Sequence, residues 1–114
     1  MTTAKMKSKS TSLKFYKLNE QAQLPVFSTK ESACFDLYAN LVVNETTEYY
    51  QAVSTKRLPR KVAFDINSNR PYLQVNNMER MLIPTGLIAD IPVGYSIRLH
   101  SRSGLAFKQG VYLA

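Results

Sequence analysis

The residues of this sequence best suited to chemistry lie at positions 101–104, where the order is Ser-Arg-Ser-Gly. The two serine hydroxyls can cap a helix, the Arg102 guanidinium is a planar donor that fits phosphate oxygens, and Gly104 lets a ligand approach the main chain. The first N–H groups of a helix lack partners within it, which also favours an anion there. The stretch predicts either a phosphate-binding loop or a solvated, capped turn, and these residues alone do not separate the two.

The segments around this loop predict how it is positioned. Residues 95–100 alternate apolar Tyr, Ile and Leu with polar Ser, Arg and His, which is the period of a half-buried strand. Residues 105–110 suit one short helical turn that closes at Gly110, because a glycine just past a helix readily adopts a positive φ. Residues 111–113 then resume a strand-like pattern. We therefore predict a strand, a capped loop, a short helix and a second strand.

The composition predicts one small globular domain. The chain has 114 residues, 45% of them hydrophobic and 20% charged. Residues 1–12 are rich in Lys, Ser and Thr and predict a flexible basic tail, so the domain would span residues 13–114. No apolar run has the length of a membrane span, and the N-terminus lacks the apolar segment of a secretory signal. We therefore expect a soluble, intracellular protein, either cytoplasmic or nuclear.

Charge and ligand-type residues narrow the classes of function. Fifteen basic residues stand against eight acidic ones, and Lys56, Arg57, Arg60 and Lys61 form one cluster. Such a cluster suits a polyanion, but we interpret it as a solvated basic loop, so nucleic acid is not the expected partner. The single cysteine, Cys34, and the single histidine exclude an internal disulfide and a multi-cysteine zinc site. A metal ion would be a hard cation held by phosphate and carboxylate oxygens.

The rest of the chain predicts short strands and turns. Candidate strands lie at residues 13–18, 48–53, 60–66 and 72–75, although the pattern between residues 40 and 77 is poorly resolved. Pro92 and Gly94 predict a hairpin within residues 80–95. Asp36 interrupts the apolar stretch 33–39, either on the wet face of an edge strand or as a carboxylate aimed at a site. These elements predict a mainly β fold, a barrel or a jelly-roll-like sandwich.

The last residues are a strand-like apolar run, Val-Tyr-Leu-Ala at 111–114, without a polar tail. Chain ends usually leave a sheet through polar residues. We therefore expect the reading frame to be partial and the complete protein to continue beyond Ala114.

Three stretches, in this order, resemble the trimeric deoxyuridine triphosphatase (dUTPase) family. Residues 33–39, Ala-Cys-Phe-Asp-Leu-Tyr-Ala, are similar to its first motif, with Cys34 where glycine is usual. Residues 83–87, Ile-Pro-Thr-Gly-Leu, and residues 91–95, Ile-Pro-Val-Gly-Tyr, resemble its central hairpin. Residues 102–111, Arg-Ser-Gly-Leu-Ala-Phe-Lys-Gln-Gly-Val, resemble its second motif, with Ser101 in the position of a proline. The resemblance covers residues 13–113.

The resemblance implies a dUTPase-like β jelly roll, or distorted β-barrel, that forms a homotrimer and hydrolyses dUTP to dUMP and pyrophosphate with Mg²⁺. It implies that Arg102, Ser103 and Gly104 bind the substrate phosphates and that Asp36 supports the metal through water. The third motif, with the Asp that activates the attacking water, would begin just beyond Ala114. No catalytic residue is therefore expected within the chain, which we interpret as the inactive N-terminal portion of a dUTPase, incomplete at its C-terminus.

Two alternatives stay open at this point. The chain could be a non-catalytic module that binds nucleotide or nucleic acid through its basic surface. It could also be a relative of the dCTP deaminases, which share the fold, although residues 104–108 suit the hydrolase better. Reading the frame past Ala114 would separate the enzyme from a remnant.

Overall fold

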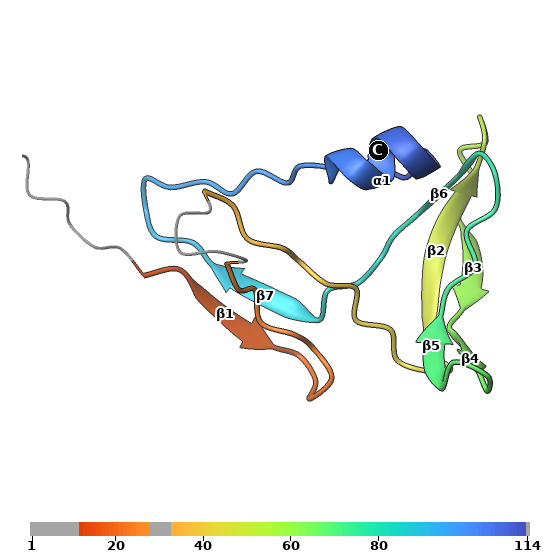
Figure 1. The fold of residues 1–114 in the computed structure, drawn as a ribbon, viewed down its shortest axis with the longest axis horizontal. Helices are drawn as coiled ribbons and strands as arrows, with labels where there is room; N and C mark the ends of the chain where they lie inside the picture. The colour runs from red at the N-terminus through yellow and green to blue at the C-terminus, as the bar shows by residue number, and fades with distance from the viewer. Residues whose placement is uncertain (1–11, 28–32, 114) are drawn as a thin grey trace, which may run out of the picture.

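A computed structural model describes residues 12–27 and 33–113 of the chain, so most of the predicted basic tail lies outside the described residues. The described part contains seven strands and one helix: β1 (Lys14–Lys17), β2 (Thr46–Gln51), β3 (Leu58–Lys61), β4 (Ala63–Asp65), β5 (Arg70–Tyr72), β6 (Glu79–Met81), β7 (Leu87–Asp90) and α1 (Ser103–Gln109). The predicted mainly β class is confirmed. The strands form open sheets that do not close into a barrel (Figure 1).

One end of the molecule is a two-stranded ribbon of β1 and β7, which run antiparallel with Phe15 opposite Ala89 and Tyr16 opposite Ile88. Alternate residues of a strand face opposite sides of a sheet, so these two pairs lie on different faces. The Phe15 ring packs edge-on against Phe35, with ring centroids 5.8 Å apart. Tyr16 and Ile88 are both about half exposed on the other face.

The other end is a three-stranded antiparallel sheet in the order β3-β2-β6, beside the β4–β5 hairpin (Figure 1). Thr47, Tyr49 and Gln51 share one face of the central strand β2 because they are two residues apart. Tyr49 is buried on this face, and Val62, between β3 and β4, is also buried. The sheet therefore has a small core of its own.

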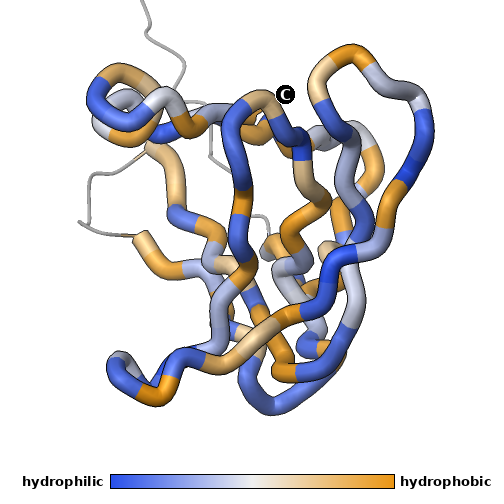
Figure 2. The backbone as a smooth tube through the Cα atoms, turned by 90° about the vertical axis from the view of Figure 1, so that its right-hand side faces the viewer, coloured by the Kyte–Doolittle hydropathy of each residue, from blue (hydrophilic) through white to orange (hydrophobic). Residues whose placement is uncertain are grey.

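The described residues bury little apolar surface in total. Ala22, Tyr49 and Val62 are their only buried hydrophobic residues, and none of their large side chains is fully enclosed. The accessible surface is 10385 Å², whereas a compact monomer of this mass would expose roughly 6300 Å². Apolar segments recur along the whole tube in Figure 2. The strands thus form an open framework.

Three predicted strands are not formed. Residues 95–100 and 111–113 belong to no strand, and the stretch 33–39 makes only an isolated bridge between Asp36 and Val26. Alternating hydrophobicity predicts a strand only when a neighbouring strand completes its hydrogen bonds. None of the described strands is a ladder neighbour of these three segments, so the prediction of strands there is wrong for this structure.

The short helix is close to its predicted position. It spans Ser103–Gln109, and Gly110 follows it with φ +67° and ψ +23°, as the sequence predicted for a glycine after a helix. The Gly110 N–H donates to the Ala106 carbonyl at 3.2 Å, which closes the last turn. No residue of α1 is buried. Among the described residues, neither this helix nor any other has the length and apolar content needed to cross a membrane.

Candidate functional site

The predicted phosphate loop lies where an extended segment meets α1. Arg102 is the N-cap residue, with φ −75° and ψ 125°, and its carbonyl accepts a hydrogen bond from the Ala106 N–H at 3.0 Å. No side chain caps the helix, so the predicted serine cap is wrong. The Ser101 hydroxyl instead accepts a hydrogen bond from the Leu113 N–H at 2.9 Å. This bond ties the segment after the helix back to the loop before it.

Arg102, Ser103 and Gly104 are contiguous and exposed. The first turn of α1 contains no acidic residue. A side chain built at Gly104 would find no heavy atom within 4 Å, so the space above this backbone is open. The loop therefore presents a guanidinium, a hydroxyl and an unobstructed main chain to solvent, which are groups that can contact an anion.

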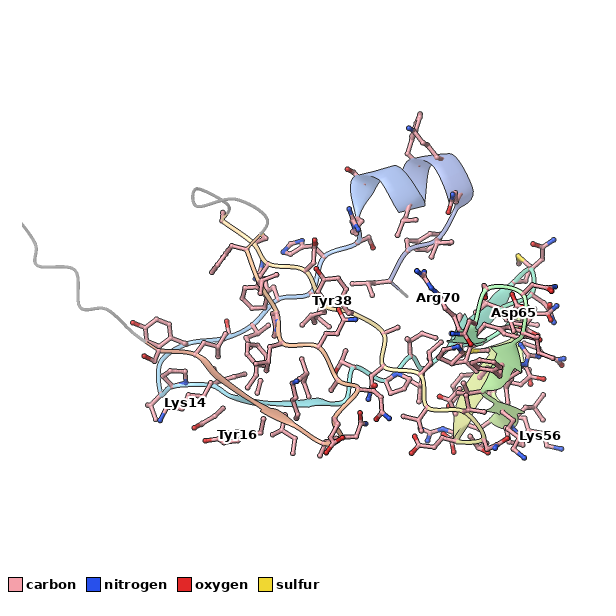
Figure 3. All side chains as sticks on the ribbon, turned by 60° about the horizontal axis from the view of Figure 1, so that its bottom comes forward. Lys14, Tyr16, Tyr38, Lys56, Asp65 and Arg70 are labelled. Carbon is pink, nitrogen blue, oxygen red and sulfur yellow. The ribbon has the colours of Figure 1, made fainter. Side chains whose placement is uncertain are left out.

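The structure places Asp36 on a different segment from this loop. Asp36 is partly exposed and forms the backbone bridge to Val26, while its neighbour Phe35 packs against Phe15 and Phe27. Among the described residues, no ion pair joins Asp36 to Arg102. Figure 3 shows Tyr38 in the part of the chain between the ribbon that carries Lys14 and Tyr16 and the end of the molecule where Lys56 and Asp65 lie. The predicted site residues thus lie on two separate segments.

Within residues 12–27 and 33–113, no three His, Cys, Asp or Glu side chains gather where they could hold a metal ion. The described residues therefore offer no preformed cage of three such side chains for a metal ion.

The basic cluster of residues 56–61 is largely engaged in internal contacts. Arg57 donates to Tyr50 and to Glu48, and these hydrogen bonds raise the pKa of its guanidinium above the ordinary value. Arg60 donates to both carboxylate oxygens of Glu79. Two of the four basic side chains, Arg57 and Arg60, are therefore paired with carboxylates of the described residues.

A cleft of about 300 Å³ opens beside this cluster, lined by Arg60, Lys61, Ala63, Tyr72, Gln74 and Asn76. It contains none of the residues that the sequence motifs assign to a site. Its volume is at the lower limit for small-molecule sites.

One residue in a special environment was not predicted from the sequence. Asn40 is 5% exposed, and it is the one buried polar residue among those described. Its side chain lies against Gly86, which has φ +67°. The glycine belongs to the hairpin motif, but an Asn is a polar residue that is usually exposed, so the sequence predicts no burial at position 40.

The chain is similar in sequence to curated proteins named deoxyuridine 5'-triphosphate nucleotidohydrolase. It is 32% identical to the one from Nautilia profundicola over 99 residues, which cover 87% of this chain and 49% of that protein. It is 30% identical to the one from Fusobacterium nucleatum over 92 residues, covering 81% of this chain and 44% of that protein. A shorter stretch of 39 residues is 54% identical to the Aquifex aeolicus protein, covering 34% of this chain and 26% of that protein.

These similarities confirm the resemblance to dUTPases that the motifs indicated. The chain spans about half the length of the curated relatives that it matches over most of its residues. No protein-family model matches the chain. No solved structure matches it either.

Proposed function

We propose that this chain supplies the phosphate-binding part of a dUTP nucleotidohydrolase, which hydrolyses dUTP to dUMP and pyrophosphate. The observation that carries the proposal is the similarity to proteins of that name over 87% of the chain. The exposed loop of Arg102, Ser103 and Gly104 supports it independently. Its guanidinium, hydroxyl and backbone N–H groups are donors of the kind from which phosphate oxygens accept hydrogen bonds. In the reaction, water attacks a phosphorus atom, the bond to the bridging oxygen breaks, and pyrophosphate leaves.

Each site residue has a distinct role in this proposal. Arg102 donates two parallel hydrogen bonds to phosphate oxygens and neutralises part of their charge. The Ser103 hydroxyl donates one further bond, and Gly104 leaves room for the phosphate chain beside the backbone. These residues bind and orient the triphosphate, which is a large part of catalysis in phosphoryl transfer.

The proposal extends to the metal ion and to the assembly. Mg²⁺ would supply charge neutralisation on the phosphates, and Asp36 would hold one of its water ligands. The working assembly would be a homotrimer, as the family resemblance implies. Only Asp36 of the eight acidic residues falls in a family motif, so residues 1–114 alone are not expected to activate the attacking water.

Nucleotide titrations of the purified chain, followed by backbone amide chemical shifts with Mg²⁺ present, test this proposal. Binding by the phosphate chain predicts that dUTP binds at least about tenfold more tightly than dUMP, since charge-assisted hydrogen bonds are lost with the terminal phosphates. dCTP and dTTP should bind within a few-fold of dUTP, because all three nucleotides carry the triphosphate that residues 102–104 are proposed to contact. Equal affinities for dUTP and dUMP, or no binding of dUTP at millimolar concentration, would refute the proposal.

A further inference from the structure

Three segments far apart in the sequence meet at Gly86. The Leu18 N–H, just after β1, donates to the Gly86 carbonyl at 2.8 Å. The Asn40 N–H donates to the Pro84 carbonyl at 2.7 Å. Ala22, which is 2% exposed, packs on the same glycine. This junction joins the start of β7 to the turn after β1 and to the segment that follows Asp36.

Gly86 has space for no side chain. A Cβ added there would lie 2.1 Å from Nδ2 of Asn40 and 2.9 Å from its Cγ, and 3.0 Å from Cβ of Ala22. Non-bonded heavy atoms prefer separations of about 3.5–4.0 Å. The buried Asn40 side chain therefore fills the space that any larger residue at position 86 would occupy.

The segment that carries Asp36 is attached to its surroundings on both sides of this residue. Asp36 itself forms the backbone bridge to Val26, and the ring of the preceding Phe35 packs edge-on against Phe15 and Phe27. On the other side, residues 37–39 are exposed, and the next buried residue is Asn40. Asn40 is thus the anchor of this segment on the C-terminal side of Asp36.

We propose that Asn40, packed against Gly86, is a positioning residue that fixes the segment bearing Asp36 against the start of β7. The functional half of this inference rests on the proposed function, in which Asp36 supports Mg²⁺ on the bound triphosphate. A shift of Asn40 releases the C-terminal end of this segment, while the carboxylate and the contacts of Phe35 remain. Such a shift weakens the contribution of Mg²⁺ to dUTP binding and leaves the contacts of Arg102 in place.

Gly94 provides a matched control for the substitution at Gly86. Gly94 also has a positive φ, +87°, but a Cβ added there meets no heavy atom within 4 Å. Gly86→Ala and Gly94→Ala therefore share the backbone cost of placing alanine in the left-handed region. Only Gly86→Ala adds a collision with Asn40. The difference between the two variants isolates the packing of Asn40.

Amide hydrogen exchange of the purified chain is the first readout, and it needs no ligand. Gly86→Ala should increase the exchange rates of the Leu18 and Asn40 amides by about tenfold or more relative to Gly94→Ala, because local opening exposes those bonds. Asn40→Ala in the Gly86→Ala background should restore part of the protection of the Leu18 amide, since it removes the colliding atoms. Equal exchange in Gly86→Ala and Gly94→Ala would overturn the proposal.

The affinity for dUTP with and without Mg²⁺ is the second readout. Asp36→Asn measures how much of the Mg²⁺-dependent dUTP affinity is lost when the carboxylate itself is removed. Asn40→Ala should reproduce part of that loss in the presence of Mg²⁺ and leave the Mg²⁺-free affinity within about twofold. An Asn40→Ala variant that keeps the full Mg²⁺ effect, or a parent chain that shows none, overturns the positioning role. A parent chain that binds no dUTP overturns the proposed function instead, and the exchange experiment still decides the packing.

Discussion

Arg60 donates hydrogen bonds to both carboxylate oxygens of Glu79, which joins the two outer strands of the three-stranded sheet across its centre. Arg60 is paired with Thr47 of β2, and Glu79 is paired with Gln51, so Tyr49 lies between them on the same face. The Arg60 Cζ is 3.9 Å from the centroid of the Tyr49 ring. The cation therefore contacts an aromatic face and a carboxylate at once.

This ion pair makes the stability of the sheet sensitive to acid. Hydrogen bonds from Arg60, assisted by the Asn76 N–H, lower the pKa of Glu79 from 4.5 to about 2. A carboxyl with a depressed folded-state pKa stabilises the fold fully above its unfolded pKa and loses this contribution as pH falls through its folded pKa. Unfolding followed from pH 6 to pH 2 should therefore show stability falling between about 4.5 and 2, and Glu79→Gln should flatten this part of the profile.

Glu48 offers the control for that experiment. Glu48 and Arg57 are also paired, but their side chains are 47% and 63% exposed, against 6% and 19% for Glu79 and Arg60. Exposed pairs contribute little because water and salt screen them. At neutral pH, Glu48→Gln should destabilise the chain less than Glu79→Gln. A larger effect at Glu48 would contradict the role of the Arg60–Glu79 pair.

The sequence predicted those parts of the fold that depend on interactions within a few neighbouring residues. Gly110 ends α1 in the left-handed region because a helix end needs only its own last turn and a residue without Cβ. The strands around Tyr49 followed from the β-branched and aromatic content of the stretch. By contrast, the alternation at residues 95–100 predicted a strand that has no ladder neighbour among the described strands.

The long-range contacts could not be predicted from sequence patterns. Arg60 and Glu79 are 19 positions apart, and the sequence shows Arg60 only as one member of a basic cluster. Asn40 is buried because Gly86 leaves room for it, which depends on a contact between segments 46 positions apart. The motif residues Arg102, Ser103 and Gly104 are found together because they are contiguous, but no local signal says where Asp36 lies relative to them.

Gly110→Val should destabilise α1 through the backbone. A Cβ at this position meets no heavy atom within 4 Å, so the cost arises from the positive φ alone. A β-branched residue in the left-handed region costs on the order of 1–3 kcal/mol. Gly110→Asn should cost less, because asparagine tolerates this region. Helix content and protection of the Gly110 amide measure the effect, and equal losses for Val and Asn would contradict the stated cause.

Gly104→Ala separates binding from folding. Open space surrounds this position, and alanine is favoured over glycine in a helix by up to about 1 kcal/mol. The variant should therefore be as stable as the parent chain or slightly more stable. Its affinity for dUTP should fall, because the added methyl group occupies the space proposed for the phosphate chain. Unchanged affinity, measured by the same titration as for the parent, would place the phosphates elsewhere.

Residues 1–114 alone should hydrolyse dUTP slowly. Among their acids, Glu48 and Glu79 are committed to arginines, and Asp65 accepts hydrogen bonds from its own turn, which lower its pKa. General-base assistance typically contributes about 10²–10⁴-fold to a rate. Pyrophosphate release with Mg²⁺ should therefore be at least about 100-fold slower than for the full-length Nautilia profundicola relative. Similar rates for the two would show that the water-activating group lies within these residues.

The most direct test of the phosphate-binding loop compares two arginine variants in a dUTP titration. Arg102→Ala should weaken dUTP binding by about 1.5–3 kcal/mol, the range for a hydrogen bond to a charged group. Arg70→Ala removes the same charge from the exposed strand β5, at the sheet end of the molecule (Figure 3), and should leave the affinity nearly unchanged. Equal titration curves for Arg102→Ala and the parent chain, or an equal loss for both variants, would contradict the assignment of residues 102–104 to the substrate phosphates.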